Sequence, residues 1–447
     1  MSVAAVASRI RAGELSPREA VESYLGRIEQ ADGALNAYIS VRAEAALAEA
    51  DAAPDGPLRG VPVAVKDVID VAGMPTTAGS RILAHNVAQR DAVCVERLRH
   101  AGAVVIGKLN THEFAFGAMT TSPHFGAAHN PWALDRICGG SSGGSGAAAA
   151  AELAAGTLGT DTAGSIRIPA CFCGVTGLRP TTGLVATGGV VPVAWSLDTV
   201  GPIARSAEDC TLLLRALTDE PLDLVENVRG LRIGVVDELF RRAEPAIAGQ
   251  VEAAVEELRA LGARIEHVDV PLLEESGTIN QLLMLTEAAE VHLPWLRTRL
   301  ADYGNDVRAR LLAGLLLPAT AHVTGLRARR WFSDELRAVF ERVDLLAAPE
   351  MPVVAPPIGE DEVEVRRQRM PYRLALIPFN SPWSLAGLPV ASVPAGFVDR
   401  LPIGLALVGR LRDEQTVLRA AHTFQCATDW HERRPPTLEA QAPPQAV

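Results

Sequence analysis

Short apolar segments alternate with helical patterns along most of the chain, and this alternation constrains the fold more than any other feature. The segment VPVAVKDVIDV at 61–71 is apolar and β-branched enough for a buried strand. The apolar segment AVVIG at 103–107 follows a helical pattern at 91–100, and the stretch 231–270 repeats the order strand, helix, strand. Strands that alternate with helices favour an α/β fold with a mainly parallel sheet.

Helix boundaries are marked by capping residues. Ser16 and Glu19 have the spacing of a capping box, and Pro17 suits the first helical position. Asp413 is expected to cap a last helix, which ends near residue 430. The stretch from about 274 to 343 is predicted to be largely helical.

Size and charge restrict the class of protein. The 447 residues are 48% apolar and 21% charged, which is ordinary for a globular protein and suits either one large α/β body or several smaller domains. The net charge of −11 makes nucleic acid an unexpected partner. No window approaches a membrane span and no secretory segment opens the chain, so we expect a cytoplasmic protein without membrane contact. Proline and polar residues predict a disordered tail over 433–447.

Cysteines, histidines and tryptophans are expected to be structural. Six scattered cysteines without zinc spacing predict buried free thiols and no metal site. They are Cys94, Cys138, Cys171, Cys173, Cys210 and Cys426. A serine–histidine dyad is conceivable but less expected for His112, His124 and His129. The core or a pocket wall is expected to contain Trp195, Trp383 and Trp430.

Two glycine- and serine-rich loops carry most of the chemical information. In GGSSGGSG at 139–146, glycines allow positive φ and close backbone approach, and serines supply hydroxyls. GTDTAGSIR at 159–167 follows a predicted strand, and consecutive N–H groups at such a turn can converge on an anion. Ser165 lies near the end of this loop, which can therefore form an oxyanion hole. The candidate donors are the backbone N–H groups of Thr162, Ala163, Gly164 and Ser165.

Each of these features also has an alternative interpretation. A glycine- and serine-rich loop is often only a flexible connector. Residues 140–144 match the nucleophile elbow G-x-S-x-G, with Ser142 as nucleophile, but the preceding residues 129–138 make a poor strand. Lys66 lies in an apolar strand, so it must be paired or have a lowered pKa. A salt bridge with a buried acid such as Asp161 is the alternative explanation, in which the buried Lys66 has a structural role and no catalytic one.

The order of these elements resembles that of the amidase-signature family. Lys66 in VAVKD comes first, GGSSGGS follows, and DTAGSIRIPA comes third, with a fitting separation between Ser141 and Ser165. The flanking segments GKLNTHEFAFG, HNPW and SLDTVGPIARS are also similar to the family. The similarity is good over residues 1 to about 217 and moderate over about 345 to 426.

The resemblance implies a fold and a set of roles. The fold is one large α/β domain over 1–432, with a mixed, mostly parallel sheet covered by helices on both faces. Ser165 corresponds to the nucleophile, Ser141 to a bridging serine that follows a cis peptide bond, and Lys66 to the base. No cofactor and no metal are implied. The second loop often has D-x-G-G-S in the family, and Ala163 replaces the first of these glycines here.

The predicted function is hydrolysis of a linear carboxamide to a carboxylate and ammonia or an amine through an acyl-enzyme on Ser165. A serine hydroxyl needs a base, and a neutral lysine whose pKa is lowered by burial can serve. We expect the Ser141 hydroxyl to lie within hydrogen-bond reach of both Lys66 and Ser165. Part of the pocket for the small amide substrate should come from residues after about Val225.

Other functions remain open on the sequence. The chain could be the A-type subunit of a glutamyl-tRNA(Gln) amidotransferase, which works with protein partners. It could instead be an allophanate- or carboxybiuret-type hydrolase. A catalytically silent scaffold is disfavoured, because all three catalytic positions are intact. The sequence leaves a homodimer open.

Overall fold

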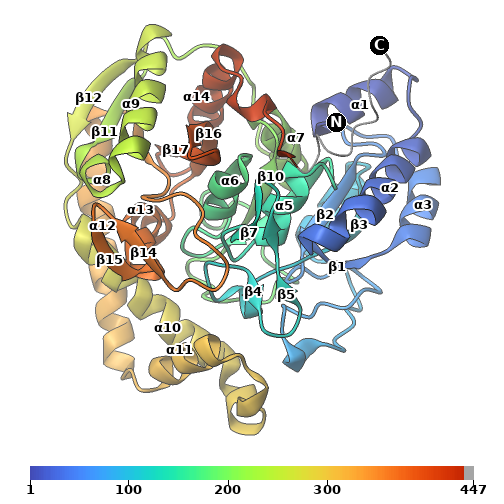
Figure 1. Ribbon diagram of the computed structural model, residues 1–447, viewed down its shortest axis with the longest axis horizontal. Coiled ribbons are helices and arrows are strands. Elements are labelled where there is room, and N and C mark those ends of the chain that lie inside the picture. The colour runs from blue at the N-terminus through green and yellow to red at the C-terminus, as the bar shows by residue number, and fades with distance from the viewer. Residues whose placement is uncertain (437–447) are drawn as a thin grey trace.

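One 11-stranded sheet organises the computed structural model, which describes residues 1–436 (Figure 1). In spatial order its strands are β1 (Tyr38–Val41), β3 (Val104–Leu109), β2 (Pro62–Lys66), β8 (Gly156–Asp161), β10 (Thr199–Ala204), β9 (Thr176–Arg179), β16 (Val390–Val398), β17 (Leu401–Gly409), β13 (Leu345–Pro349), β11 (Arg232–Val236) and β12 (Arg264–Val268). Three two-stranded ribbons lie outside it. They are β4 (Thr121–Ser122) with β5 (Gly126–Ala127), β6 (His129–Asn130) with β7 (Ala133–Ile137), and β14 (Glu362–Val365) with β15 (Gln368–Pro371).

The sheet is mixed, and its parallel pairs form two blocks. One block is β3, β2 and β8, and the other is β13, β11 and β12. The pairings between these blocks are antiparallel, as is that of β1 with β3. The α/β class and the mixed sheet are confirmed, although parallel pairs occur only in the two blocks. One reason is that β16 and β17 are joined by a tight turn, which can connect only antiparallel neighbours.

The α-helices of residues 1–436 follow the predicted alternation. They are α1 (Val3–Arg11), α2 (Pro17–Leu35), α3 (Ala43–Asp51), α4 (Val93–His100), α5 (Gly143–Ala150), α6 (Arg167–Cys173), α7 (Ala207–Leu217), α8 (Asp237–Arg242), α9 (Pro245–Ala260), α10 (Leu273–Thr298), α11 (Asn305–Leu315), α12 (Ala319–Arg342), α13 (Tyr372–Ala386) and α14 (Glu414–Ala427). The capping box of α2 is present, because the Ser16 side chain accepts from the Glu19 N–H and the Glu19 carboxylate accepts from the Ser16 N–H. Asp413 caps α14 as predicted.

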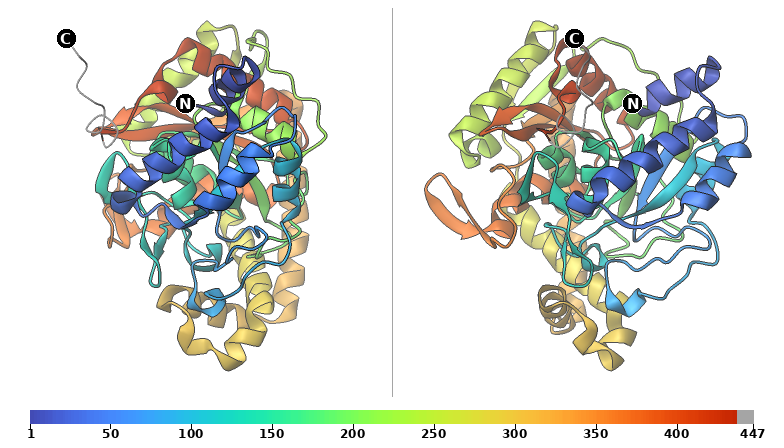
Figure 2. Two further views of the ribbon diagram at one scale, coloured as in Figure 1. Left: turned by 90° about the vertical axis from the view of Figure 1, so that its right-hand side faces the viewer. Right: turned by 45° about the vertical axis from the view of Figure 1, so that its right-hand side comes forward.

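Helices cover both faces of the sheet (Figure 2). Gly156 and Gly159 lie three residues apart in β8, so they point to opposite faces. A Cβ on Gly156 would meet Leu213 of α7, whereas a Cβ on Gly159 would meet Ser142 and Ile166, which lead into α5 and α6. The two faces of β8 therefore carry different helical layers, and the two glycine- and serine-rich loops lie on the same face.

A second group of helices forms the lower part of the molecule in Figure 1. There α10 packs against α11, which projects away from the sheet, and α10 also packs against α12 and α13, which reach higher in this view. Within residues 1–436 no single helix has the length and apolar character to cross a membrane. Only α11 and α12 meet these criteria together, as a pair bent by 95°.

The predicted tail at 433–447 falls mostly outside the described residues. Its first residues pack on the body of the protein. The carbonyl of Arg433 accepts a hydrogen bond from Arg205, and Arg434 forms an ion pair with Glu152 at 2.7 Å. For these two residues the expectation of disorder is wrong, because a buried guanidinium and a carboxylate hold them.

Candidate active site

The three predicted catalytic positions meet at the carboxyl end of two neighbouring strands. Lys66 is the last residue of β2, rather than the middle of a longer strand, and Ser165 follows the end of β8. These strands are parallel neighbours, so their carboxyl ends lie at the same edge of the sheet. Ser141 lies in the loop that leads into α5. The sheet therefore brings together residues that are about 100 positions apart in the chain.

Lys66 is held between two hydroxyl groups. Its Nζ donates to the Oγ of Ser141 at 2.8 Å and to the Oγ1 of Thr160 at 2.8 Å. The peptide bond between Gly140 and Ser141 is cis. The predicted contact between Lys66 and Ser141 and the cis peptide are thus both confirmed. Thr160 was missed because a threonine inside a strand is ordinary, and only its position near the strand end could have singled it out.

The charge state of Lys66 depends on its surroundings. Burial lowers its pKa to about 7, against the opposing effect of Asp161 and Asp198. The alternative of a salt bridge with Asp161 is wrong, because no carboxylate of residues 1–436 lies within 4.0 Å of Lys66. Asp161 pairs instead with Arg167 at 3.0 Å and Arg179 at 2.9 Å. Burial would raise the pKa of Asp161, but the two guanidinium groups hold it well below its usual value. A neutral Lys66 is therefore accessible near neutral pH.

Ser165 lies in the wall of a small pocket and is 8% exposed. Its hydroxyl forms no hydrogen bond within residues 1–436, so the expected bond between the Ser141 and Ser165 hydroxyls is not formed in this structure. The two loops are joined instead through the backbone, because the Ser142 N–H donates to the Ser165 carbonyl at 3.2 Å. This arrangement leaves the Ser165 hydroxyl free to face the pocket.

The backbone donors of the second loop are not equivalent. The Gly164 N–H donates to Asp161 Oδ1 at 2.8 Å, so it is not available to an oxyanion. The N–H groups of Thr162, Ala163 and Ser165 have no acceptor within residues 1–436, and these three residues line the pocket. Gly164 has φ 115°, and a Cβ there would lie 2.3 Å from Asn380 Oδ1, so this position requires glycine.

The nucleophile-elbow interpretation of Ser142 is wrong. Ser142 is buried, and its hydroxyl donates to the Thr160 carbonyl and accepts from the Thr160 N–H. A strand does precede this loop, contrary to expectation, because β7 spans Ala133–Ile137. However, β7 pairs with β6 in a separate ribbon, so it cannot act as the central strand that an elbow needs. Ser142 anchors the loop on β8.

Within residues 1–436 no other candidate side chain bonds to the hydroxyls of these serines, although the His112 N–H donates to the Ser141 carbonyl at 3.2 Å. The three histidines bind other groups, so no serine–histidine dyad is formed: the contacts are His112 to Asp306, His124 to Glu113 and His129 to the Leu134 carbonyl. Trp383 is buried as expected and Trp430 packs against the core. Trp195 is 54% exposed and does not line the pocket of Ser165, so it belongs neither to the core nor to that pocket wall. Five cysteines are buried free thiols, and Cys426 is exposed.

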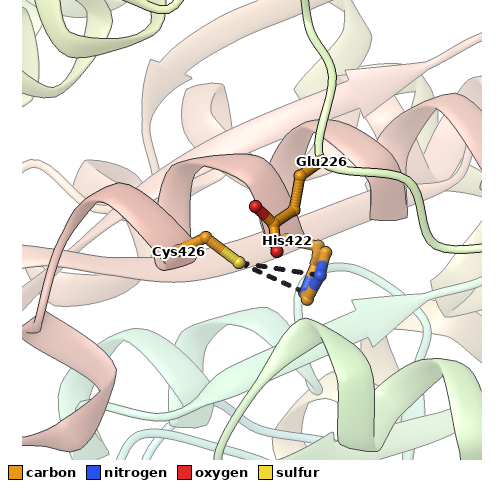
Figure 3. Close-up of side chains that lie close together, drawn as sticks. All are labelled: Glu226, His422 and Cys426. Carbon is orange, nitrogen blue, oxygen red and sulfur yellow. Dashed lines mark hydrogen bonds between the residues drawn. The ribbon is translucent and has the colours of Figure 1, made fainter.

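One cluster of metal-binding residue types lies on the surface (Figure 3). Glu226, His422 and Cys426 place one potential ligand atom each within 4.8 Å of one another. Burial and the neighbouring Glu226 raise the pKa of the Cys426 thiol to about 11. The Sγ of Cys426 and the Nε2 of His422 are 3.6 Å apart, which is a hydrogen-bond distance for sulfur.

The pocket that contains Ser165 is small and mostly apolar. Its water-accessible volume is about 50 Å³. Several of its residues come from α10, α11 and α13, which confirms that part of the pocket lies after Val225. Its lining residues are Ala115, Phe116, Gly117, Ala118, Gly140, Thr162, Ala163, Ser165, Ile168, Gln281, Met284, Arg310, Arg373, Leu376, Ile377 and Ser381.

Comparisons with known proteins agree with this geometry. The family model described as amidase matches residues 19–418. The A-type subunit of the glutamyl-tRNA(Gln) amidotransferase of Methylococcus capsulatus is 37% identical over 97% of this chain and 98% of its own length. A protein of the same name from Methanosarcina mazei is 39% identical over 98% of this chain and 99% of its own.

Solved structures give the same result. A chain from a vestigial protein complex that reveals the evolutionary origins of an s-triazine catabolic enzyme is 38% identical, with a TM-score of 0.91 over 96% of this chain and 98% of that chain. A bacterial aryl acylamidase of the amidase-signature family is 26% identical, with a TM-score of 0.88 over 99% of both chains. This chain therefore belongs to the amidase family and is an enzyme that acts on amide carbon–nitrogen bonds.

Proposed function

We propose that this enzyme hydrolyses a small linear carboxamide with Ser165 as nucleophile, Ser141 as proton relay and Lys66 as base. The observation that carries the proposal is the environment of Lys66. This lysine is fully buried and has no carboxylate partner within residues 1–436, and it donates to the Ser141 hydroxyl at 2.8 Å. A buried lysine without a counter-ion favours its neutral form, which is the form that can accept a proton.

The proposed steps begin when the Ser165 hydroxyl turns from the pocket to donate to the Ser141 Oγ, a bond that this structure does not contain. Neutral Lys66 takes the proton of Ser141 while Ser141 takes that of Ser165, and the Ser165 Oγ attacks the amide carbonyl carbon. The N–H groups of Thr162, Ala163 and Ser165 stabilise the tetrahedral oxyanion. The proton then returns through Ser141 to the amide nitrogen, and ammonia or an amine leaves. Water attacks the acyl-enzyme with the same base and releases the carboxylate.

Two neighbours support the relay without touching the substrate. The Oγ1 of Thr160 accepts the second hydrogen bond of Lys66 and so fixes the direction of its side chain. Asp161 holds the second loop, because its carboxylate accepts from the Gly164 and Ile166 N–H groups. Arg167 and Arg179 hold this carboxylate in turn. We assign positioning roles to this buried network.

The test compares two serines of the two loops. Ser165→Ala should abolish turnover of aliphatic and aryl amides and labelling by a fluorophosphonate probe, with an unchanged circular dichroism spectrum. Ser142→Ala is the matched control, because Ser142 is buried and bonded to the Thr160 backbone. It should keep its labelling at Ser165. An active Ser165→Ala enzyme, or a probe adduct on Ser142, would refute the assignment.

A second candidate function is that of one component of an amidotransferase. The similarity to the A-type subunits of two glutamyl-tRNA(Gln) amidotransferases supports it. The two functions differ in their need for a partner. The purified chain should hydrolyse simple amides alone if it is an independent amidase, whereas dependence on added partner subunits with glutamine as amide donor would favour the second function.

A further inference from the structure

The pocket beside Ser165 contains two guanidinium groups that the proposed reaction does not use. Arg310 projects from α11 and Arg373 from α13, and both line the pocket with Ser165. Much of the remaining lining is apolar, including Met284 and Leu376. A neutral amide offers nothing that would require a positive charge, so these groups indicate a further feature of the substrate.

Arg310 has its own partners. It donates to Asp306 Oδ2 at 2.8 Å and to the carbonyl of Phe116, and its Cζ lies 4.3 Å from the centroid of the Phe116 ring. Asp306 also lies 3.2 Å from His112 Nε2. The charge of Arg310 is therefore balanced by a carboxylate, and its position is fixed.

Arg373 lacks such a counter-ion. Its one hydrogen bond runs from Nη2 to the Oε1 of Gln281 at 3.1 Å, and no carboxylate within residues 1–436 lies within 4.0 Å. Burial lowers the pKa of Arg373, and Asp306 opposes this effect. An arginine still remains protonated at neutral pH, so a partly buried cation is left without a paired anion. Gln281 is neutral, and it orients the guanidinium without neutralising it.

We propose, on the basis of the proposed function, that the substrate is a short linear amide with a carboxylate at its other end, and that Arg373 binds this carboxylate with Arg310 beside it. The planar guanidinium fork matches the two oxygens of a carboxylate. The pocket is small, with a water-accessible volume of about 50 Å³, which favours a short chain between the amide and the carboxylate. The chemical class is the monoamide of a short dicarboxylic acid and its close analogues.

The test uses a pair of amides that differ in this group. Succinamate and butyramide have the same chain of four carbons, and only succinamate carries the carboxylate. The wild-type kcat/KM should be at least about 10-fold higher for succinamate. Arg373→Gln should lower kcat/KM for succinamate by roughly 10- to 100-fold, the range for a hydrogen bond to a charged group, and that for butyramide by less than about 3-fold.

Arg369→Gln is the matched control, because Arg369 lies in the adjacent ribbon and pairs at the surface with Glu362. It removes the same charge from the same region and should leave both kcat/KM values within about 2-fold. Arg373→Lys should restore part of the preference, since it keeps the charge and loses the fork. Equal effects of Arg373→Gln and Arg369→Gln, or equal effects of Arg373→Gln on the two amides, would overturn the proposal.

A binding measurement separates this proposal from the catalytic one. Succinamate should bind the folded Ser165→Ala protein at least about 10-fold more tightly than butyramide in calorimetry, and Arg373→Gln should remove this difference. Such binding without turnover by the wild type would refute the proposed hydrolysis and still support the carboxylate site. Turnover of butyramide, with no preference for malonamate, succinamate or glutaramate in rate or binding, would refute the carboxylate site and still support the proposed hydrolysis.

Discussion

The pH dependence of activity should report the protonation of Lys66. Burial lowers the pKa of this lysine to about 7, and only its neutral form can accept the proton of Ser141. kcat/KM should therefore rise with pH and level off above about pH 8. Roughly half of the enzyme should be active at pH 7, about a tenth at pH 6 and about a hundredth at pH 5. A lysine with an ordinary pKa would place this limb above about pH 9.

Substitution of Lys66 separates a base from a charge. Arginine keeps the positive charge but cannot become neutral at usable pH. Lys66→Arg should therefore lose activity almost as completely as Lys66→Ala, by about 10²- to 10⁴-fold, which is the usual contribution of a general base. Lys66→Met is the structural control, because it keeps much of the volume of this fully buried side chain without a charge.

The assay is initial-rate hydrolysis of one good amide between pH 5 and 10, with the melting temperature of each variant measured under the same conditions. The reasoning fails if Lys66→Arg keeps much of the activity that Lys66→Ala loses, because Lys66 would then act as a charge. It also fails if the wild-type limb lies above pH 9. A folded Lys66→Met enzyme with wild-type kcat/KM would likewise refute a role in proton transfer.

Three further substitutions test the surroundings of this lysine. Thr160→Val removes an acceptor that favours the charged form of Lys66, so the acid limb should move down by about one pH unit; an unmoved or raised limb would contradict this. Gly164→Ala forces a Cβ against Asn380 at positive φ and should cost about 1 to 3 kcal/mol in urea unfolding as well as most activity. Normal stability and activity would show that the loop adapts. Asp161→Asn leaves the buried Arg179 without a carboxylate and Arg167 with only Glu350 at 3.8 Å, so a loss of about 3 to 5 kcal/mol in urea unfolding is expected, and a loss below about 1 kcal/mol would refute the role of this network.

Features that depend on neighbouring residues were predictable from the sequence. The capping box of Ser16 and Glu19 forms because its partners are three residues apart. The glycine- and serine-rich composition of the two loops is equally visible along the chain, and the resemblance of Lys66, Ser141 and Ser165 to a known pattern predicted the candidate site. The α/β class followed from the alternation of strands and helices.

Features that depend on distant partners were not predictable in this way. Arg167 and Arg179 form ion pairs with the carboxylate of Asp161, and Lys66 bonds to hydroxyl groups instead. These pairings depend on residues that are distant in the chain. Thr160 enters the site only because β8 lies beside β2. The antiparallel centre of the sheet likewise reflects which strands become neighbours after folding.

The substrate pocket shows the same division most clearly. The sequence by itself determined the candidate catalytic residue types and the loops that hold them, because their chemistry is contained in short segments. Only the tertiary structure placed Arg310 and Arg373 beside Ser165, since they lie on α11 and α13, which both pack against α10. Charge balance in a buried pocket is a sum over all neighbours in space, and a pattern along the chain does not contain that sum.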